Sequence, residues 1–331
     1  MLWLDCRDTH IRGRLYVWGN SVLAEEVLCD YSSSHLRVTT SLLEVLRRLA
    51  TLPSGTAGRA PYWIDGVCIN QEDLEERSDQ VQKMANIYRR AARVHVFLGA
   101  FDSRHSSILE SKWFTRRWVV QEAIAAQEVI LHFKVDGEWR LLHGWDALRS
   151  RAGSLLLKAY NDPVIPPAAN FLRDIAGTTR TSWSSIFALM LKFHTAQCKE
   201  DSDRLFALLG VAKDVESESQ AGDGAAYMSQ FQALKIHFQP DYTLDTPQVY
   251  KNFAIAALQS PLAFDLLHCA GAFRKHHDAT SIRWPCWVPD WRCARLYSPL
   301  MRAPECQASI SRTAGKQAVS RRRSIVLNES N

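Results

Sequence analysis

Two carboxylates in apolar surroundings are the side chains of this sequence best placed to carry chemistry. Glu122 follows Trp118 by four positions, so both side chains share one face of a predicted helix. An aromatic neighbour partly desolvates a carboxylate and raises its pKa. Asp65 stands near the carboxyl end of a predicted buried strand, where open α/β sheets place their ligand sites. Each carboxylate also has a structural interpretation, as a cap or as the ion-pair partner of an arginine such as Arg116 or Arg117.

The residues after Asp65 offer weaker candidates. Cys68 could act as a nucleophile only beside a base, and the nearest histidine, His95, falls on the next predicted strand. We therefore expect a small buried thiol there. Asn70 and Gln71 are expected to close the strand-to-helix turn, although amides at that edge could also bind a ligand. The eight cysteines include no C-x-x-C pair and no zinc spacing, so we expect reduced, buried thiols and no metal.

The elements that must position these side chains alternate between strand and helix. Apolar runs predict strands at Leu15–Trp18, Leu36–Thr40, Tyr62–Ile69, Val94–Leu98 and Val129–Phe133. Helices are predicted after Ser41 and after Asn70, which act as caps, and from Trp113 to Gln127. This alternation favours parallel βαβ units in an open sheet covered by helices on both faces. No glycine-rich dinucleotide or P-loop motif follows a strand.

Beyond residue 135 the pattern becomes mainly helical. Helices are predicted at Trp183–Phe193, Arg204–Val211 and Thr246–Gln259, and an exposed loop at Asp214–Ala225. We expect three regions: an α/β domain at 15–135, a helical extension at 136–300 and a disordered basic tail at 301–331.

Composition limits the class of protein. Of the 331 residues, 47% are hydrophobic and 23% charged, as in a soluble globular protein. The net charge of +5 comes in part from Arg321, Arg322 and Arg323, which we interpret as a solvated tail and not as a nucleic-acid site. The sequence has no secretory signal and no long apolar run, so we expect a cytoplasmic protein without membrane or nucleic-acid partners.

Several blocks resemble fungal heterokaryon-incompatibility (HET) domains. The run Tyr62-Trp63-Ile64-Asp65-Gly66-Val67-Cys68-Ile69-Asn70-Gln71 is similar to the family signature, an apolar strand and an aspartate followed by Cys-Ile-Asn-Gln. Further similar blocks are Gln80-Val81, Ile87-Tyr88, Leu98-Gly99, Trp113-Phe114 and Arg117-Trp118-Val119-Val120-Gln121-Glu122. At the front, Tyr16, Trp18 and Gly19 match the opening strand of the family, but Gly13, Arg14 and Leu15 depart from it.

The second half resembles the extension common in this family. The similar pieces are Asp203-Arg204-Leu205-Phe206-Ala207-Leu208-Leu209-Gly210, Pro240-Asp241-Tyr242 and Trp287-Val288-Pro289-Asp290-Trp291. The resemblance implies a role in non-self recognition that leads to programmed cell death when unlike hyphae fuse. Partners would then be other proteins, including further copies of the chain itself.

A second resemblance concerns Glu122. The spacing from Trp118 to Glu122 is similar to the Trp-x-x-x-Glu motif of TIR domains, to which the HET fold looks related and whose sheet is flavodoxin-like. In TIR domains that cleave NAD, this glutamate supports breakage of the nicotinamide–ribose bond. The leaving group is already cationic, so a carboxylate beside the developing oxocarbenium ion suffices. Two hypotheses follow: an interaction module without a cofactor, or an NAD-cleaving enzyme that uses Glu122 on NAD as its substrate.

Overall fold

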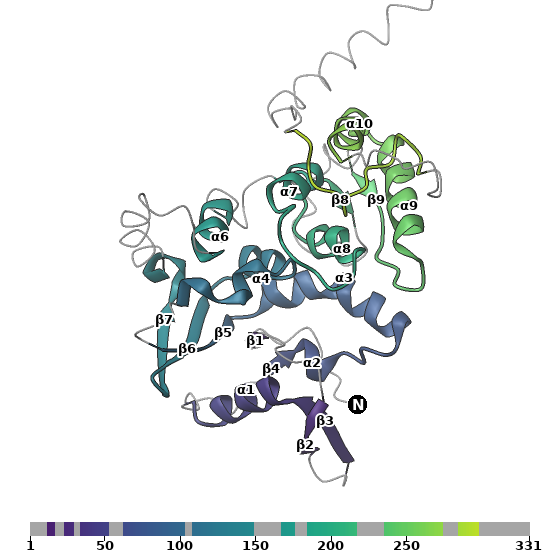
Figure 1. Cartoon of the computed structure of the whole chain (residues 1–331). Coiled ribbons are helices and arrows are strands. Elements are labelled where there is room, and N and C mark those ends of the chain that lie inside the picture. The colour runs from purple at the N-terminus through teal and green to yellow at the C-terminus, as the bar shows by residue number, and fades with distance from the viewer. Residues whose placement is uncertain are drawn as a thin grey trace, which may run out of the picture.

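A computed structural model describes residues 12–16, 23–29, 34–52, 62–102, 108–148, 167–175, 184–216, 235–273 and 284–297. Trp18, the predicted tail at 301–331 and residues 217–225 of the predicted loop lie outside these ranges. The described part is mixed α/β, as the alternating pattern predicted. A sheet lies on one side of α3 and α4, and a group of helices lies on the other side (Figure 1).

The main sheet has five strands in the order β4-β1-β5-β6-β7. These strands are β1 (Arg12–Tyr16), β4 (Tyr62–Ile64), β5 (Arg93–Phe101), β6 (Val129–Val135) and β7 (Glu138–His143). The first four strands in this order pair in parallel, and β7 pairs antiparallel with β6 through the turn at Asp136 and Gly137. One strand of the sheet therefore follows residue 135, where the sequence placed the end of the first domain.

Helix α1 (Thr40–Ala50) covers one face of this sheet, beside a hairpin of β2 (Leu23–Cys29) and β3 (Ser34–Thr39). Val38, Leu42 and Val45 pack with Ile64 and Phe97 of the sheet in a small core. The Thr39 hydroxyl caps α1 by accepting from the Leu42 amide at 3.1 Å. The prediction of Ser41 as the cap was wrong, because Thr39 already supplies this acceptor and the helix starts at Thr40.

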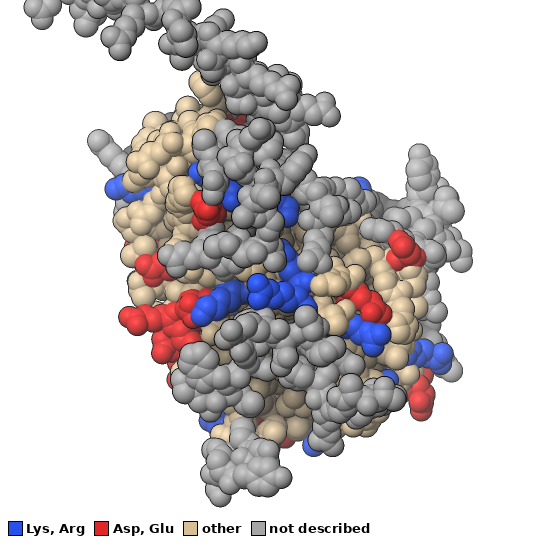
Figure 2. All heavy atoms as spheres, turned by 180° about the vertical axis from the view of Figure 1, so that it is seen from behind, with Lys and Arg blue, Asp and Glu red and all other residues tan. Residues whose placement is uncertain are grey.

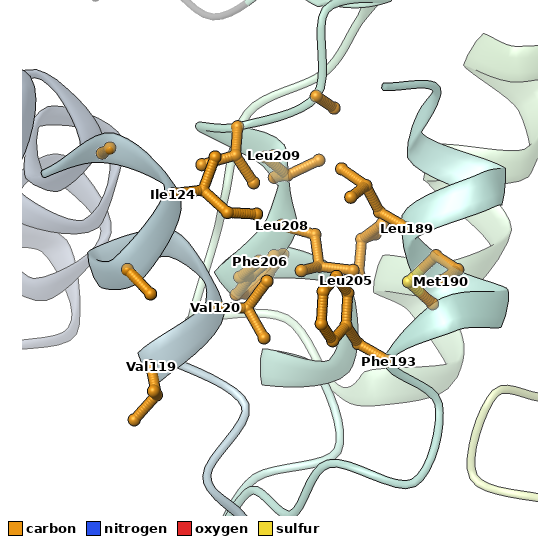
Figure 3. Packing of buried hydrophobic residues seen from close by; sticks show 14 of the residues in the cluster. Val119, Val120, Ile124, Leu189, Met190, Phe193, Leu205, Phe206, Leu208 and Leu209 are labelled. Carbon is orange, nitrogen blue, oxygen red and sulfur yellow. The ribbon is translucent and has the colours of Figure 1, made fainter. Parts of the chain in front are cut away.

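The opposite face carries α3 (Leu74–Arg90) and α4 (Val119–Ala125). Above them lie α6 (Pro167–Ile175), α7 (Ile186–Lys192), α8 (Asp203–Leu209), α9 (Thr246–Leu258) and α10 (Ala263–Ala272), with the short parallel pair β8 (Val215–Glu216) and β9 (Ile236–His237). In Figure 3, Val120 and Ile124 of α4 point toward α8, which lies between α4 and α7. A single hydrophobic core runs from Trp63 to Trp291, so the two predicted regions share one interior.

Two element predictions in the first region were wrong. The strand expected at Tyr62–Ile69 ends at Ile64, and Asp65–Cys68 forms the one-turn helix α2. The helix expected from Trp113 is instead two elements, the 3-10 turn η2 (Lys112–Thr115) and the helix α4. Another 3-10 turn, η1 (Ile108–Glu110), precedes them. The break occurs because Gln197 donates to the Thr115 carbonyl at 2.6 Å and accepts from the Arg117 amide at 2.7 Å. Those groups are therefore not used in a continuous helix.

Two predictions about polar residues were also wrong. Asp73, not Asn70, caps α3, because its carboxylate accepts from the amides of Glu75 and Glu76 at 3.0 Å each. Asp214, expected in an exposed loop, is buried and accepts from the Ile186 amide at 2.8 Å at the start of α7. Asp214 therefore satisfies the amino end of a buried helix.

Charge is unevenly spread over the surface. Seen from behind, Lys and Arg gather in a band across the middle of the molecule, with Asp and Glu toward its ends (Figure 2). Within the described ranges no helix is long and apolar enough to cross a membrane. Among the described thiols Cys269 is buried, whereas Cys68, Cys198 and Cys293 are partly buried and Cys286 is exposed, so the expectation of buried thiols is confirmed for Cys269 and was wrong for Cys286.

Gly210 of the extension packs closely against Ala85 of α3. A Cβ atom added at Gly210 would lie 2.3 Å from the Cβ of Ala85, which belongs to the rigid interior. We expect Gly210→Ala to lower the free energy of unfolding by about 1–3 kcal/mol, because neither backbone can retreat easily. Chemical denaturation of both proteins measures the change.

Gly271→Ala is the matched control. Its added Cβ would also meet an atom at 2.3 Å, but that atom is the hydroxyl of Tyr297, whose exposed side chain can move. Since Gly271 lies within α10, alanine should leave stability unchanged or raise it by up to about 1 kcal/mol. Equal losses in the two variants would contradict the tight contact at Gly210.

Candidate functional site

The carboxyl end of β4 turns directly into α2, and Asp65 stands at this corner. Asp65 is half-buried, and its Oδ1 accepts from the Gly66 amide at 2.7 Å. The Cys68 sulfur lies 3.5 Å from the Ile64 amide, one turn of helix away. Burial raises the pKa of the Cys68 thiol, so the thiolate needed by a nucleophile is disfavoured. His95 is the histidine nearest to Cys68 in the sequence, and its imidazole lies 2.9 Å from that of His132 on β6.

Asn70 and Gln71 close the turn between α2 and α3. The Asn70 side chain accepts from the Glu72 amide at 3.2 Å, and its backbone amide donates to the Glu76 carboxylate at 3.1 Å. The Gln71 amide donates to the Asp65 carbonyl at 3.4 Å. Both side chains are exposed, so these contacts order a surface turn.

Glu122 is buried on α4, with 1% of its surface exposed. Burial raises its pKa to about 8, and the charge of Asp65 adds to the shift while Arg116 opposes it. Its Oε2 has no hydrogen-bond partner among the described residues. The carboxyl group is therefore mainly protonated at neutral pH.

Tyr88 of α3 belongs to the same cluster. It is fully buried, and within the described part of the chain its hydroxyl has no hydrogen-bond partner. Burial raises the pKa of Tyr88, and the charges of Glu122 and Asp65 raise it further. The fold thus brings Asp65, Cys68 and Glu122 together around a phenol that sequence reasoning missed, although Tyr88 stands within one of the family blocks.

Arg117 points away from this cluster into the extension. Its guanidinium is buried and donates to the carbonyl oxygens of Phe193 and Arg204, with the sulfur of Met190 at 3.0 Å. Burial lowers its pKa to about 10, which still leaves it charged at neutral pH. The suggested ion pair between Arg117 and Glu122 is absent, because these carbonyls take the guanidinium.

Trp118 also serves the extension. Its side chain hydrogen-bonds to the carboxylate of Asp203 on α8, which accepts from the Tyr242 hydroxyl at 2.6 Å as well. The guanidinium of Arg77 lies over the Tyr242 ring at 3.7 Å and pairs with Glu200 at 2.7 Å. Asp203 and Tyr242 were not predicted as site residues, but both stand within the blocks that resemble the family extension.

The Glu122 carboxyl can hold or release a proton, but Glu122 and Tyr88 have almost no contact with solvent. A ligand would reach Glu122 or Tyr88 only if neighbouring segments moved. No group of three His, Cys, Asp or Glu side chains in the described part of the molecule could hold a metal ion. Arg116 and Asp65 are the charged side chains whose fields act on the Glu122 carboxyl group.

Comparison with known proteins places similarity in the first part of the chain. Residues 15–107 match the family model described as heterokaryon incompatibility protein (HET). Heterokaryon incompatibility protein 6, OR allele, of Neurospora crassa is 43% identical over 91 residues, which cover 25% of this chain and 13% of that protein. Vegetative incompatibility protein HET-E-1 of Podospora anserina is 33% identical over 82 residues, or 22% and 6% of the two chains.

These matches support the HET family for the segment that carries Asp65, Cys68, Asn70 and Gln71. They span only a small part of either relative, and the family match ends before Arg117, Trp118 and Glu122. No solved structure matches the chain.

Arg117→Lys tests the contact between the two halves of the molecule. Lysine keeps the charge but cannot reach both carbonyls with a planar fork, so we expect the free energy of unfolding to fall by about 2–4 kcal/mol. The control is Arg93→Lys, at an exposed pair with Glu128 at 2.8 Å, where the loss should stay below about 0.5 kcal/mol. Urea denaturation of both variants gives the values, and similar losses would argue against a special role of Arg117.

The pH dependence of stability reports the state of Glu122. Its pKa is raised from 4.5 to about 8 in the folded chain, so the folded state holds a proton that the unfolded state releases. The free energy of unfolding should therefore fall as pH rises from 4.5 toward 8, by a few kcal/mol on the order of the shift. Glu122→Gln should remove this loss and be the more stable protein at pH 8.

Asp214 contributes in the same direction, because burial raises its pKa from 3.8 to about 6. Above pH 6 most of the contribution of Asp214 has already been lost, so the change in stability between pH 6 and 8 reports mainly on Glu122. Thermal melting in that interval should show stability falling more steeply with pH for the native chain than for Glu122→Gln, in which His194, whose pKa is lowered, adds stability as pH rises through its unfolded value. An unchanged slope in the variant would mean that Glu122 is ionised in the folded protein.

Proposed function

We propose that this chain is a non-self recognition module of heterokaryon incompatibility, which triggers programmed cell death by assembling with other proteins, including copies of itself. The observation that carries the proposal is the similarity of residues 15–107 to the HET family and to two proteins named for incompatibility. The α/β region and the extension would act as one body, because they share a core and the Arg117 contact.

The burial of Glu122 favours assembly over chemistry. A glutamate that stabilises a developing cation must be ionised and must face the substrate. Here the carboxyl group has 1% exposure, and its pKa is raised to about 8. Trp118, the tryptophan of the Trp-x-x-x-Glu spacing, hydrogen-bonds to Asp203 of the extension. Both observations are expected of residues that hold a signalling domain in shape.

NAD cleavage is the second candidate function. Counted by chain position, the sheet strands run 2-1-3-4-5, the order of flavodoxin-like folds, and this supports a TIR-like architecture. Asp65, which adds to the raised pKa of Glu122, follows the carboxyl end of β4, and open α/β sheets bind their ligands outside the carboxyl ends of strands. In this proposal, movement of the surrounding segments would expose and ionise Glu122, and NAD would be the substrate.

One pair of variants separates the two candidates. We expect induced expression of the chain to arrest growth of a filamentous fungus, and light scattering of the purified chain to show mass increasing with concentration. Glu122→Gln keeps the shape of a protonated carboxyl group, so an assembly mechanism should keep both effects within about twofold. Glu128→Gln makes the same chemical change at a half-exposed ion pair and is the control.

Release of nicotinamide from NAD is measured in parallel, at the highest protein concentration that stays in solution. No release by the native chain, together with growth arrest by Glu122→Gln, supports the assembly mechanism. Release that disappears in Glu122→Gln but not in Glu128→Gln, together with loss of arrest, would replace it by the enzymatic one. Absence of growth arrest and of mass increase in the native chain would contradict the incompatibility proposal itself.

A further inference from the structure

Three arginines converge on the carboxyl end of α7, away from the Glu122 cluster. Arg295 donates to the Leu191 carbonyl at 3.3 Å, and Arg204 donates to the His194 carbonyl at 3.2 Å. Arg117 donates to the Phe193 carbonyl between them. The His194 imidazole also lies 3.1 Å from the Leu191 carbonyl, so it shares an acceptor with Arg295. The last turn of α7 and the two residues after it therefore gather four basic side chains.

Negative charge at this place does not balance the arginines. The end of a helix contributes the equivalent of roughly half a negative charge. Asp201 lies 3.5 Å from Arg204, and no other carboxylate of the described residues is within ion-pair distance of Arg117, Arg204 or Arg295. Burial lowers the pKa of His194, and the charges of all three arginines lower it further.

Other arginines in the same part of the fold form close ion pairs with carboxylates. Arg292 meets both oxygens of Asp290, at 2.7 and 2.9 Å, and Arg77 pairs with Glu200 at 2.7 Å. By contrast, Arg295 uses one of its five N–H donors on a carbonyl in the described part of the chain. The Nε of Arg204 is buried, makes no hydrogen bond to any described residue, and lies 3.5 Å from the Asp201 carboxylate.

We propose that the carboxyl end of α7 is an anion site, in which His194, Arg204 and Arg295 bind the phosphate group of a small ligand. Guanidinium groups bind phosphate through short charge-assisted hydrogen bonds, and a dianion matches the excess positive charge better than a single carboxylate. The buried Arg117 contributes its charge but not its donors, which the main chain already occupies. This inference does not depend on the incompatibility role.

Calorimetric titration of the full chain with sodium pyrophosphate, at constant ionic strength, tests the site. We expect saturable binding that Arg295→Gln weakens by roughly tenfold, the effect of removing one charge-assisted contact. Arg140→Gln removes the same charge from an exposed position on β7 and should change the dissociation constant by less than about twofold. Titration with glycerol phosphate shows whether a phosphate ester binds as the inorganic ion does.

Each outcome bears on the proposal. Selective weakening in Arg295→Gln supports it, whichever of the two phosphate sources binds more tightly. Equal weakening in Arg295→Gln and Arg140→Gln would show attraction to net charge and overturn the site. Absence of saturable binding by the native chain at millimolar pyrophosphate would overturn it as well. Circular dichroism of both variants establishes that the fold is kept.

Discussion

The burial of one guanidinium decides how the two halves of this molecule are joined. Arg117 lies at the start of α4, in the α/β region, yet every acceptor that it uses in the described part of the chain belongs to the extension. A cation removed from water is tolerated only when hydrogen bonds replace its hydration. The carbonyls of Phe193 and Arg204 supply these bonds, and the end of α7 adds a favourable dipole.

The same contact explains the geometry around α4. The backbone of Gln197 hydrogen-bonds to Thr115 and Arg117, on either side of Arg116. This pairing ends the 3-10 turn η2 and fixes the orientation of α4. Trp118 then reaches Asp203, while Glu122, one turn later, is enclosed beside Tyr88 and Asp65. Trp118 and Glu122 belong to one sequence block but have different roles. Trp118 joins the α/β region to the extension, and Glu122 belongs to the buried cluster.

Sequence reasoning recovered the elements whose cause is local. The buried strands β5 and β6 and the helix α9 lie close to their predicted ranges, because apolar runs and caps are short-range signals. The strand expected beyond Ile64 and the helix expected from Trp113 were wrong, since a one-turn helix at Asp65 and a distant pairing with Gln197 decided those segments. Likewise the burial of Glu122 and the partners of Arg117 depend on residues far away in the chain.

The shared core has a consequence for how such chains can change by recombination. Buried residues of the described ranges, from Trp63 to Trp291, belong to one core that spans both sides of residue 135. A hybrid that joined the α/β region to an unrelated extension would inherit a buried cation without acceptors and an apolar face without cover. Productive exchange therefore requires that α4, α7 and α8 be inherited together, which ties the inheritance of the extension to that of the domain preceding it.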